Sequence, residues 1–383
     1  MSREFEKAID SITPELLQSY LESQNWIKDG NISDQATIWH REHDELYGHE
    51  VIQPSNSNIR SYGQRLVEAF KAIAEFENRE ISAVVDDMLN FSLDLIKVRV
   101  EHPDVEGGTI PLDDGVLLIE RSRDLLIAST LSTFKKQKVF SGSRSQDVQD
   151  FLSKLKLGQT EVGSFVVNLI SPIEINRNAQ KDGCETSLAR SVSVNLARSL
   201  TAISAAVSKY SDSKSIFDFE ETVGKGVSAN LCDALIGLSG RTKSRCFSIK
   251  IKTGGLEAEP INFYNNYEFS PQSIPYLEAA SEYLKGRYTV KNFHVSGLVS
   301  VLKHLPNDEY GQVTVKALIK GKLKSITIQL PLEEYWLAFD AHRTGNEVSC
   351  HGTLNVSPRS AQLLEPSSFE VTGRTDGFFM TKT

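Results

Sequence analysis

The C-terminal part of the sequence, residues 288–372, contains short runs in which apolar and polar residues alternate, as they do in β-strands. A helical run, 332–343, interrupts them after the third strand. Gly297 lies in the middle of the long first run, where a glycine allows a strand to bend and to pair with both halves of a barrel. The sequence therefore predicts five strands closed into a barrel with one helix.

The expected strands are 290–303, 312–319, 323–330, 347–356 and 361–371. The large apolar residues that share one side of the helix are Leu332, Tyr335, Trp336 and Phe339.

Two short patterns accompany this order of elements. The first strand contains Val295-x-Gly297-x-Val299, and the fourth contains Val348-x-Cys350-x-Gly352-x-Leu354. Together with the helix between strands three and four, these patterns resemble the OB fold. The resemblance covers residues 288–372 only, and it implies a fold more than a function.

OB folds often bind single-stranded nucleic acid through a basic groove and aromatic rings that stack on bases. The second hairpin of the expected barrel is rich in lysine, and two rings lie in the first strand. The nucleic-acid-binding candidates are therefore Lys316, Lys320, Lys322, Lys324, Phe293 and His294. Lys320, Lys322 and Lys324 alternate and can share one face of a strand. A second interpretation stays open, in which the lysines protect an edge strand from aggregation and Phe293 belongs to the core.

The residues before the barrel mix helices and strands without a regular βαβ rhythm, which indicates an α+β fold. We expect an N-terminal domain over 1–175, a middle domain over 176–287, the barrel over 288–372 and a tail over 373–383. A turn is expected at Asp113-Asp114-Gly115. The expected helices are 14–23, 60–77, 79–90, 116–134, 186–210, 228–238 and 270–284. The expected strands are 93–100, 165–170, 246–251 and 260–263, with a hairpin between 26 and 52.

Charge and cysteine content narrow the function classes. The net charge of −8 and the pI of about 5.6 leave no basic field over the whole chain, so nucleic-acid binding would require a local patch. The four cysteines form no C-x-x-C pair, which favours reduced thiols over disulfides or a zinc site. The N-terminus lacks a secretory signal and no apolar run approaches the length of a membrane span. We expect a cytoplasmic protein with no membrane contact.

Two further segments could bind anions. Lys135, Lys136 and Lys138 lie between Phe134 and Phe140, a pattern that suits a nucleic-acid strand but equally an ordinary solvated loop. A second segment, with Gly224, Gly226 and Ser228, precedes a helix whose first amides could receive a phosphate. Its P-loop spacing is incomplete, so a capped helix start is the alternative.

The histidines of residues 40–49 are the remaining cluster. His40, His43 and His49 lie close together, but their spacing matches no zinc motif, and a polar loop explains them as well. No catalytic, metal or cofactor motif is complete, so we assign no catalytic residue, no metal and no cofactor.

Three segments resemble a family of bacterial proteins that look like accessory components of gene clusters, with a link to phage defence. The segments are Ile110-Pro111-Leu112, residues 157–165 and residues 226–232. The family has no known activity, so the resemblance implies no catalytic residue.

Three functions remain open at this point. The first is a non-enzymatic binding protein that contacts single-stranded nucleic acid through the barrel and a protein partner or another copy through its N-terminal region, as part of a bacterial defence complex. The second is a protein scaffold with no nucleic-acid contact. The third is a nuclease or phosphate-handling enzyme with an unrecognised site.

Overall fold

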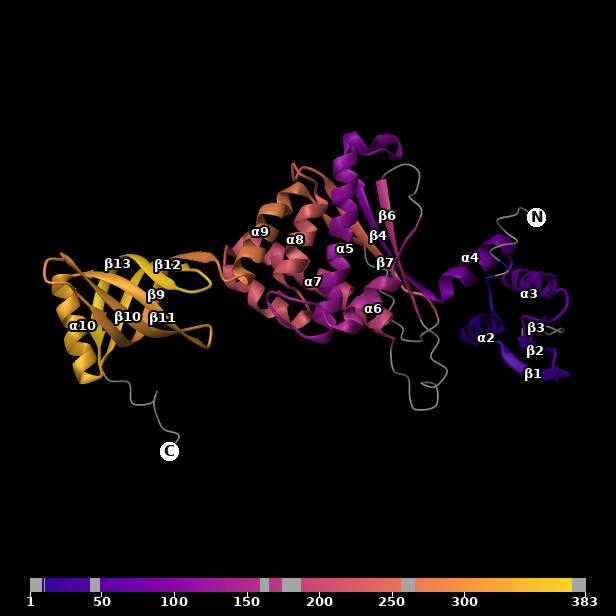
Figure 1. Ribbon diagram of the computed structural model, residues 1–383, viewed down its shortest axis with the longest axis horizontal. Helices are drawn as coiled ribbons and strands as arrows, with labels where there is room; N and C mark the ends of the chain where they lie inside the picture. The colour runs from indigo at the N-terminus through magenta and orange to yellow at the C-terminus, as the bar shows by residue number, and fades with distance from the viewer. Residues whose placement is uncertain are drawn as a thin grey trace, which may run out of the picture. The chain divides into compact units, whose positions relative to one another are not determined.

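The structure, a computed structural model, describes residues 9, 11–41, 49–158, 165–173, 187–255 and 266–373 (Figure 1). It confirms a mixed α+β fold, and the chain divides into two compact units. Unit 1 comprises Met1–Ser204 and Gly224–Ile274, and unit 2 comprises Ala205–Val223 and Pro275–Thr383.

The first part of unit 1 packs three helices with a small antiparallel sheet. The helices are α2 (Pro14–Ser23), α3 (Tyr62–Glu77) and α4 (Ile81–Phe91), and the strands are β1 (Ile27–Ile32), β2 (Ala36–Arg41) and β3 (His49–Pro54). Thr13 caps α2, because its side chain accepts a hydrogen bond from the amide of Leu16. Trp39 donates from Nε1 to Gln53 Oε1 at 2.7 Å, which satisfies a polar group inside an apolar cluster.

The second part of unit 1 contains an antiparallel five-stranded sheet in the order β5-β6-β4-β7-β8. The strands are β5 (Lys156–Leu157), β6 (Phe165–Pro172), β4 (Leu93–Glu101), β7 (Cys246–Lys252) and β8 (Asn266–Phe269). This sheet draws strands from both sides of residue 175, where the sequence predicted a domain boundary. The predicted strand at 260–263 lies outside the described residues.

Helices complete this part of the unit. They are α5 (Leu112–Phe134), α6 (Gln146–Lys154), α7 (Leu188–Ser213) and α8 (Ala229–Leu238), with 3-10 turns at η1 (Pro103–Gly108) and η4 (Pro271–Ser273). Helix α5 contacts α8 and β6, and Ser129 on α5 donates a hydrogen bond to the carbonyl of Val192 on α7. The turn predicted at Asp113–Gly115 is wrong. These residues form the first turn of α5, where carboxylates favour a helix start.

A buried ion pair joins the sheet to α7. Asp94 and Arg190 are 0% and 1% exposed, and Arg190 Nε lies 3.2 Å from both carboxylate oxygens of Asp94. The backbone of Gly254 completes the group: its amide donates to Asp94 Oδ1 at 3.0 Å, and its carbonyl accepts from Arg190 Nη2. Both charges are therefore bonded in a place that water does not reach.

Unit 2 contains the predicted five strands, closed into a ring in the order β10-β11-β13-β12-β9. The strands are β9 (Tyr288–Lys303), β10 (Tyr310–Ile319), β11 (Lys322–Pro331), β12 (Glu347–Val356) and β13 (Ala361–Thr372). All neighbours are antiparallel except β11 and β13, whose parallel pairing joins Ile326–Ile328 to Ala361–Leu363. At Gly297 the strands pass so closely that a Cβ would overlap the carbonyl oxygen of Lys316.

Helix α10 (Leu332–Thr344) contacts all five strands and closes one end of the barrel (Figure 1). The residues that face the barrel are Tyr335, Ala338 and Ala341. The predicted apolar side was therefore only partly right, because Trp336 and Phe339 are 53% and 43% exposed. The two alanines let the helix lie close to the strands, and the Tyr335 ring lies over Gly311, where any Cβ would overlap it.

The remaining elements of unit 2 lie outside the barrel. They are the last residues of α7, most of the 3-10 segment η3 (Ile216–Lys225) and most of helix α9 (Ile274–Leu284). Phe217 of η3 packs against the barrel core. The 3-10 segment η3 therefore packs against the end of the barrel where β9 begins and where β10 turns into β11.

Candidate functional site: a basic and aromatic hollow in unit 2

The predicted lysines of the second hairpin do not form one surface. Lys316 points outward on β10, because its neighbours Val315 and Ala317 are buried. Lys322 and Lys324 lie on the other side, which they share with the buried Ile326 of β11. Lys320 occupies the turn with a φ of 48°. The expected common face therefore holds for Lys322 and Lys324 only.

Two of these lysines attach the hairpin to η3. The Nζ atom of Lys320 lies 5.1 Å from the ring centroid of Phe217, and Lys322 Nζ lies 3.2 Å from Glu220 Oε1. Tyr283 donates from its hydroxyl to the other oxygen of Glu220 at 2.6 Å. Burial and this carboxylate together raise the pKa of Tyr283 far above its usual range, so the phenol stays protonated and keeps donating.

Next to this contact lies a hollow of about 690 Å³, which we call the aromatic hollow. Its walls come from the end of α7, η3, α9 and the first residues of β9. The lining residues are Tyr210, Lys214, Ser215, Ile216, Phe217, Ala279, Glu282, Arg287, Tyr288, Thr289, Val290 and Lys291. Its size is in the range of small-molecule and cofactor sites, roughly 300–1,000 Å³.

Half-buried aromatic rings form part of the wall. The ring centroids of Phe217 and Tyr288 are 6.1 Å apart at an interplanar angle of 78°, and those of Tyr283 and Tyr288 are 4.9 Å apart. Tyr210 contributes a third ring to the lining, held edge-on against Tyr276 at 5.8 Å. Rings that are fixed by their neighbours offer a preorganised surface on which a planar ligand can stack.

The lining contains more cations than carboxylates. Lys214, Arg287 and Lys291 carry positive charge, and Glu282 is the one carboxylate among the lining residues. Glu282 accepts from Arg287 at 2.6 and 2.9 Å, and this pairing lowers the pKa of the Glu282 carboxyl. Lys214 and Lys291 are exposed, so their ammonium groups can meet an anion at the surface. A planar ring with an attached phosphate matches both features of the hollow.

Sequence reasoning missed these residues and proposed others on the barrel. Phe293 is half-buried against the barrel core, which leaves it little face for stacking. His294 is exposed on β9, opposite His351 of β12, with ring centroids 4.6 Å apart. Neither residue lines the aromatic hollow.

The other two predicted basic and anion-binding segments contact each other in unit 1. Ala229, the first residue of α8, donates its amide to the carbonyl of Lys138 at 2.8 Å, and the side-chain amide of Asn230 exchanges two hydrogen bonds with the backbone of Phe140. Ser228 caps the helix by accepting from the amide of Leu231 at 3.2 Å. The backbone amides of Ala229 and Leu231, at the start of α8, therefore already donate to groups of the chain, where the sequence predicted that an anion could bind.

Lys136 and Gly226 have packing roles at the same place. Lys136 donates from Nζ to the side-chain oxygen of Asn195, and burial, helped by the nearby Arg198, lowers the pKa of its ammonium group. Gly226 has a φ of 100°, and a Cβ there would lie 2.5 Å from Ser199 Oγ. Gly224 has open space around it, and Lys135 is exposed.

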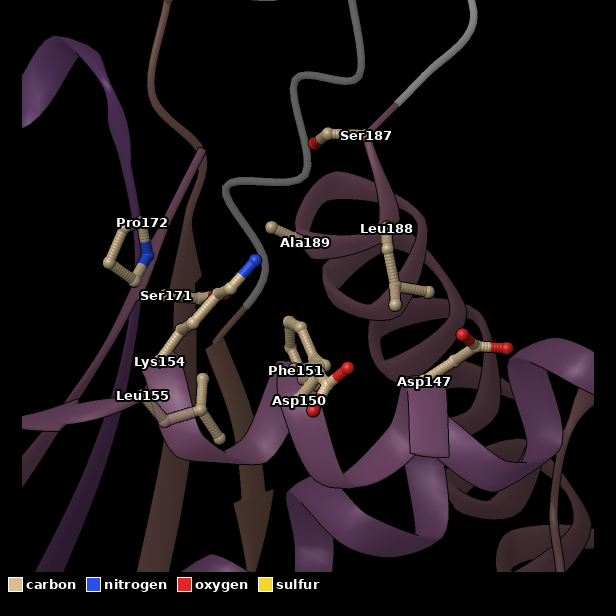
Figure 2. Close-up of a pocket in the computed structure, with 10 residues that line it drawn as sticks. All are labelled: Asp147, Asp150, Phe151, Lys154, Leu155, Ser171, Pro172, Ser187, Leu188 and Ala189. Carbon is tan, nitrogen blue, oxygen red and sulfur yellow. The ribbon is translucent and has the colours of Figure 1, made fainter. Parts of the chain in front are cut away.

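Unit 1 also has a smaller cavity of about 290 Å³ between α6, β6 and the start of α7 (Figure 2). Asp147, Asp150 and Lys154 lie around it, and Phe151 forms its floor. Ser171 is 2% exposed, and its hydroxyl has no hydrogen-bond partner among the described residues. The mixed charge of this cavity gives it no clear preference for an anion or a cation.

Within the described residues, no group of three or more histidine, cysteine, aspartate or glutamate side chains could hold a metal ion. His40 Nδ1 lies 4.0 Å from Asp29 Oδ2, His49 stacks edge-on against Phe76, and His43 lies outside the described residues. No helix in the described ranges is both long enough and apolar enough to cross a bilayer.

In comparisons with known proteins, no family model, no curated protein and no solved structure matches this chain.

Proposed function

We propose that unit 2 binds single-stranded nucleic acid, with a base in the aromatic hollow and the neighbouring phosphates on Lys214 and Lys291. The observation that carries this proposal is the combination of fixed aromatic rings and exposed cations around one hollow of about 690 Å³. A stacked base contributes about 1–3 kcal/mol with little dependence on sequence, and lysines add a salt-dependent attraction.

The barrel supports the proposal by its topology. Its ring order, with one helix between the third and fourth strands, resembles the arrangement of an OB fold, a frequent scaffold for single-stranded ligands. The local excess of cations also explains how a chain with a net charge of −8 could attract a polyanion at one place.

The test is fluorescence anisotropy with labelled single-stranded and duplex oligonucleotides over a salt series. We expect salt-sensitive binding that favours the single strand. The double variant Lys214→Gln/Lys291→Gln should weaken it, and the slope of log affinity against log salt should fall by about 0.7 for each lysine. The matched control is Lys28→Gln/Lys71→Gln, which removes the same charge from exposed positions of unit 1 and should leave binding unchanged.

A second variant addresses the rings. Tyr288→Leu keeps an apolar side chain against the barrel but removes the stacking face, so we expect weaker affinity and an unchanged salt slope. Equal losses in the control and the Lys214/Lys291 variant, or no binding by the intact protein at low salt, would refute the proposal.

A further inference from the structure

The end of the barrel opposite the aromatic hollow carries an exposed apolar surface. It consists of Leu305, Trp336 and Phe339, which are 67%, 53% and 43% exposed, and we call it the α10 surface. The Trp336 ring lies 5.7 Å from Phe339 and 6.4 Å from His304, the neighbour of Leu305. Trp336 and Phe339 therefore lie side by side, and the loop that carries Leu305 lies next to Trp336.

The loop before β10 is fixed against the helix. His304 Nε2 makes a 3.1 Å hydrogen bond with the carbonyl oxygen of Asp308, and its ring lies 5.4 Å from that of Tyr335. Because Tyr335, Ala338 and Ala341 already face the barrel, Trp336 cannot turn inward without displacing them. Contiguous exposed apolar residues that the fold cannot bury mark interaction sites in soluble proteins.

The rim of the α10 surface is acidic. Asp308, Glu309 and Glu333 are exposed. Asp340 is exposed too, and it pairs with Arg343 at 3.3 Å. The exposed Lys303 precedes His304, so four carboxylates lie around the surface with one ammonium and one guanidinium, and this excess of negative charge favours a partner that brings positive charge.

We propose that the α10 surface docks a protein segment with large apolar side chains flanked by lysine or arginine. Tryptophan at the centre of a patch is a frequent energetic anchor of protein interfaces, and complementary rim charges select the partner and speed its approach. The hollow lies where β9 begins, and α10 lies where β9 ends and β10 begins. One barrel would then hold a nucleic-acid strand at one end and a protein at the other.

The test uses the full chain and two synthetic helical peptides. One has leucines on one face and lysines on the other, and the second has glutamates in place of the lysines. Trp26 and Trp39 are 3% and 2% exposed against 53% for Trp336, so a change in quenchable tryptophan fluorescence reports the α10 surface. We expect the lysine peptide to protect Trp336 from a quencher and to bind about tenfold more tightly than the glutamate peptide.

Variants separate docking from general attraction to an acidic protein. Trp336→Ala/Phe339→Ala should weaken binding of a labelled lysine peptide about tenfold or more. The control Leu318→Ala/Leu323→Ala removes exposed apolar residues from the β10–β11 hairpin and should have no effect. Asp308→Lys/Glu333→Lys should reverse the preference in favour of the glutamate peptide.

Other outcomes would overturn the proposal. Equal peptide binding by the intact protein and the Trp336/Phe339 variant would show that the surface is not the site. A concentration-dependent dimer in light scattering that disappears in that variant would assign the surface to a second copy of the chain. Oligonucleotide binding by the same variant should stay unchanged, which keeps this test separate from that of the aromatic hollow.

Discussion

Asp94 and Arg190 show how much a single contact can matter when both charges are buried. Neither has access to water, so each relies on the other and on the backbone of Gly254. The sequence alone does not pair the two residues, because Asp94 and Arg190 are 96 positions apart in the chain. The fold brings α7 against β4 at this point, and Gly254, just after β7, contacts both side chains.

Arg190→Met should therefore lower the free energy of unfolding by about 3–5 kcal/mol, since it leaves the Asp94 carboxylate buried without its counter-charge. Urea denaturation followed by circular dichroism would measure the loss. Arg241→Met is the control, because Arg241 and Asp113 form a pair at 3.0 Å in which both side chains are mostly exposed. A change within about 1 kcal/mol is expected there. Similar losses in the two variants would contradict the argument from burial.

At the scale of elements, Gly297 has a steric role besides the one that the sequence suggested. A bend was expected in the long first strand, and β9 does pair with both β10 and β12. The structure adds a steric reason, because the strand passes directly over the carbonyl of Lys316. A glycine is the residue that permits this approach.

Gly297→Ala should destabilise unit 2 by about 1–3 kcal/mol, as expected when a well-packed site must accept an extra carbon. The loss of stability would appear as a lower midpoint temperature of thermal unfolding. Gly30→Ala in β1 is the matched control, since a Cβ there has open space and we expect almost no change. A stable Gly297→Ala variant would mean that β9 can move away from β10 at little cost.

The barrel strands could be predicted because side chains on a strand alternate between core and solvent. On α10 the largest apolar residues did not identify the buried side. The side that faces the barrel carries Tyr335 and two alanines, whereas Trp336 and Phe339 are exposed. Helix α6 was not predicted, although Val148 and Phe151 lie three residues apart and both are buried. Short helices with two apolar residues give too little periodicity to be recognised.

The aromatic hollow could not be found from the sequence for another reason. Its lining comes from residues 210–217 and from residues 279–291, and no local motif connects them. The nearest signal is the interleaving of charge and aromatics around Arg287, Tyr288 and Lys291. That pattern becomes informative only when η3 is placed beside it.

At the scale of the whole molecule, the two units have separate apolar cores, and unit 2 is assembled from two distant stretches of sequence. Chains with several cores often unfold in more than one step. Differential scanning calorimetry should therefore resolve more than one transition, with Arg190→Met and Gly297→Ala lowering different ones. A single transition that both substitutions lower equally would show that the units unfold as one.

The position of β13 in the ring has a consequence for the newly made chain. This strand follows β11 and β12 in the sequence but lies between them in the ring, so neither of them has its second neighbour until residues 361–372 have left the ribosome. Chains emerge N-terminal end first, and unpaired strand edges invite pairing with other chains. Each molecule therefore passes through an interval in which four strands exist and the ring is open, and a chaperone would be most useful during that interval.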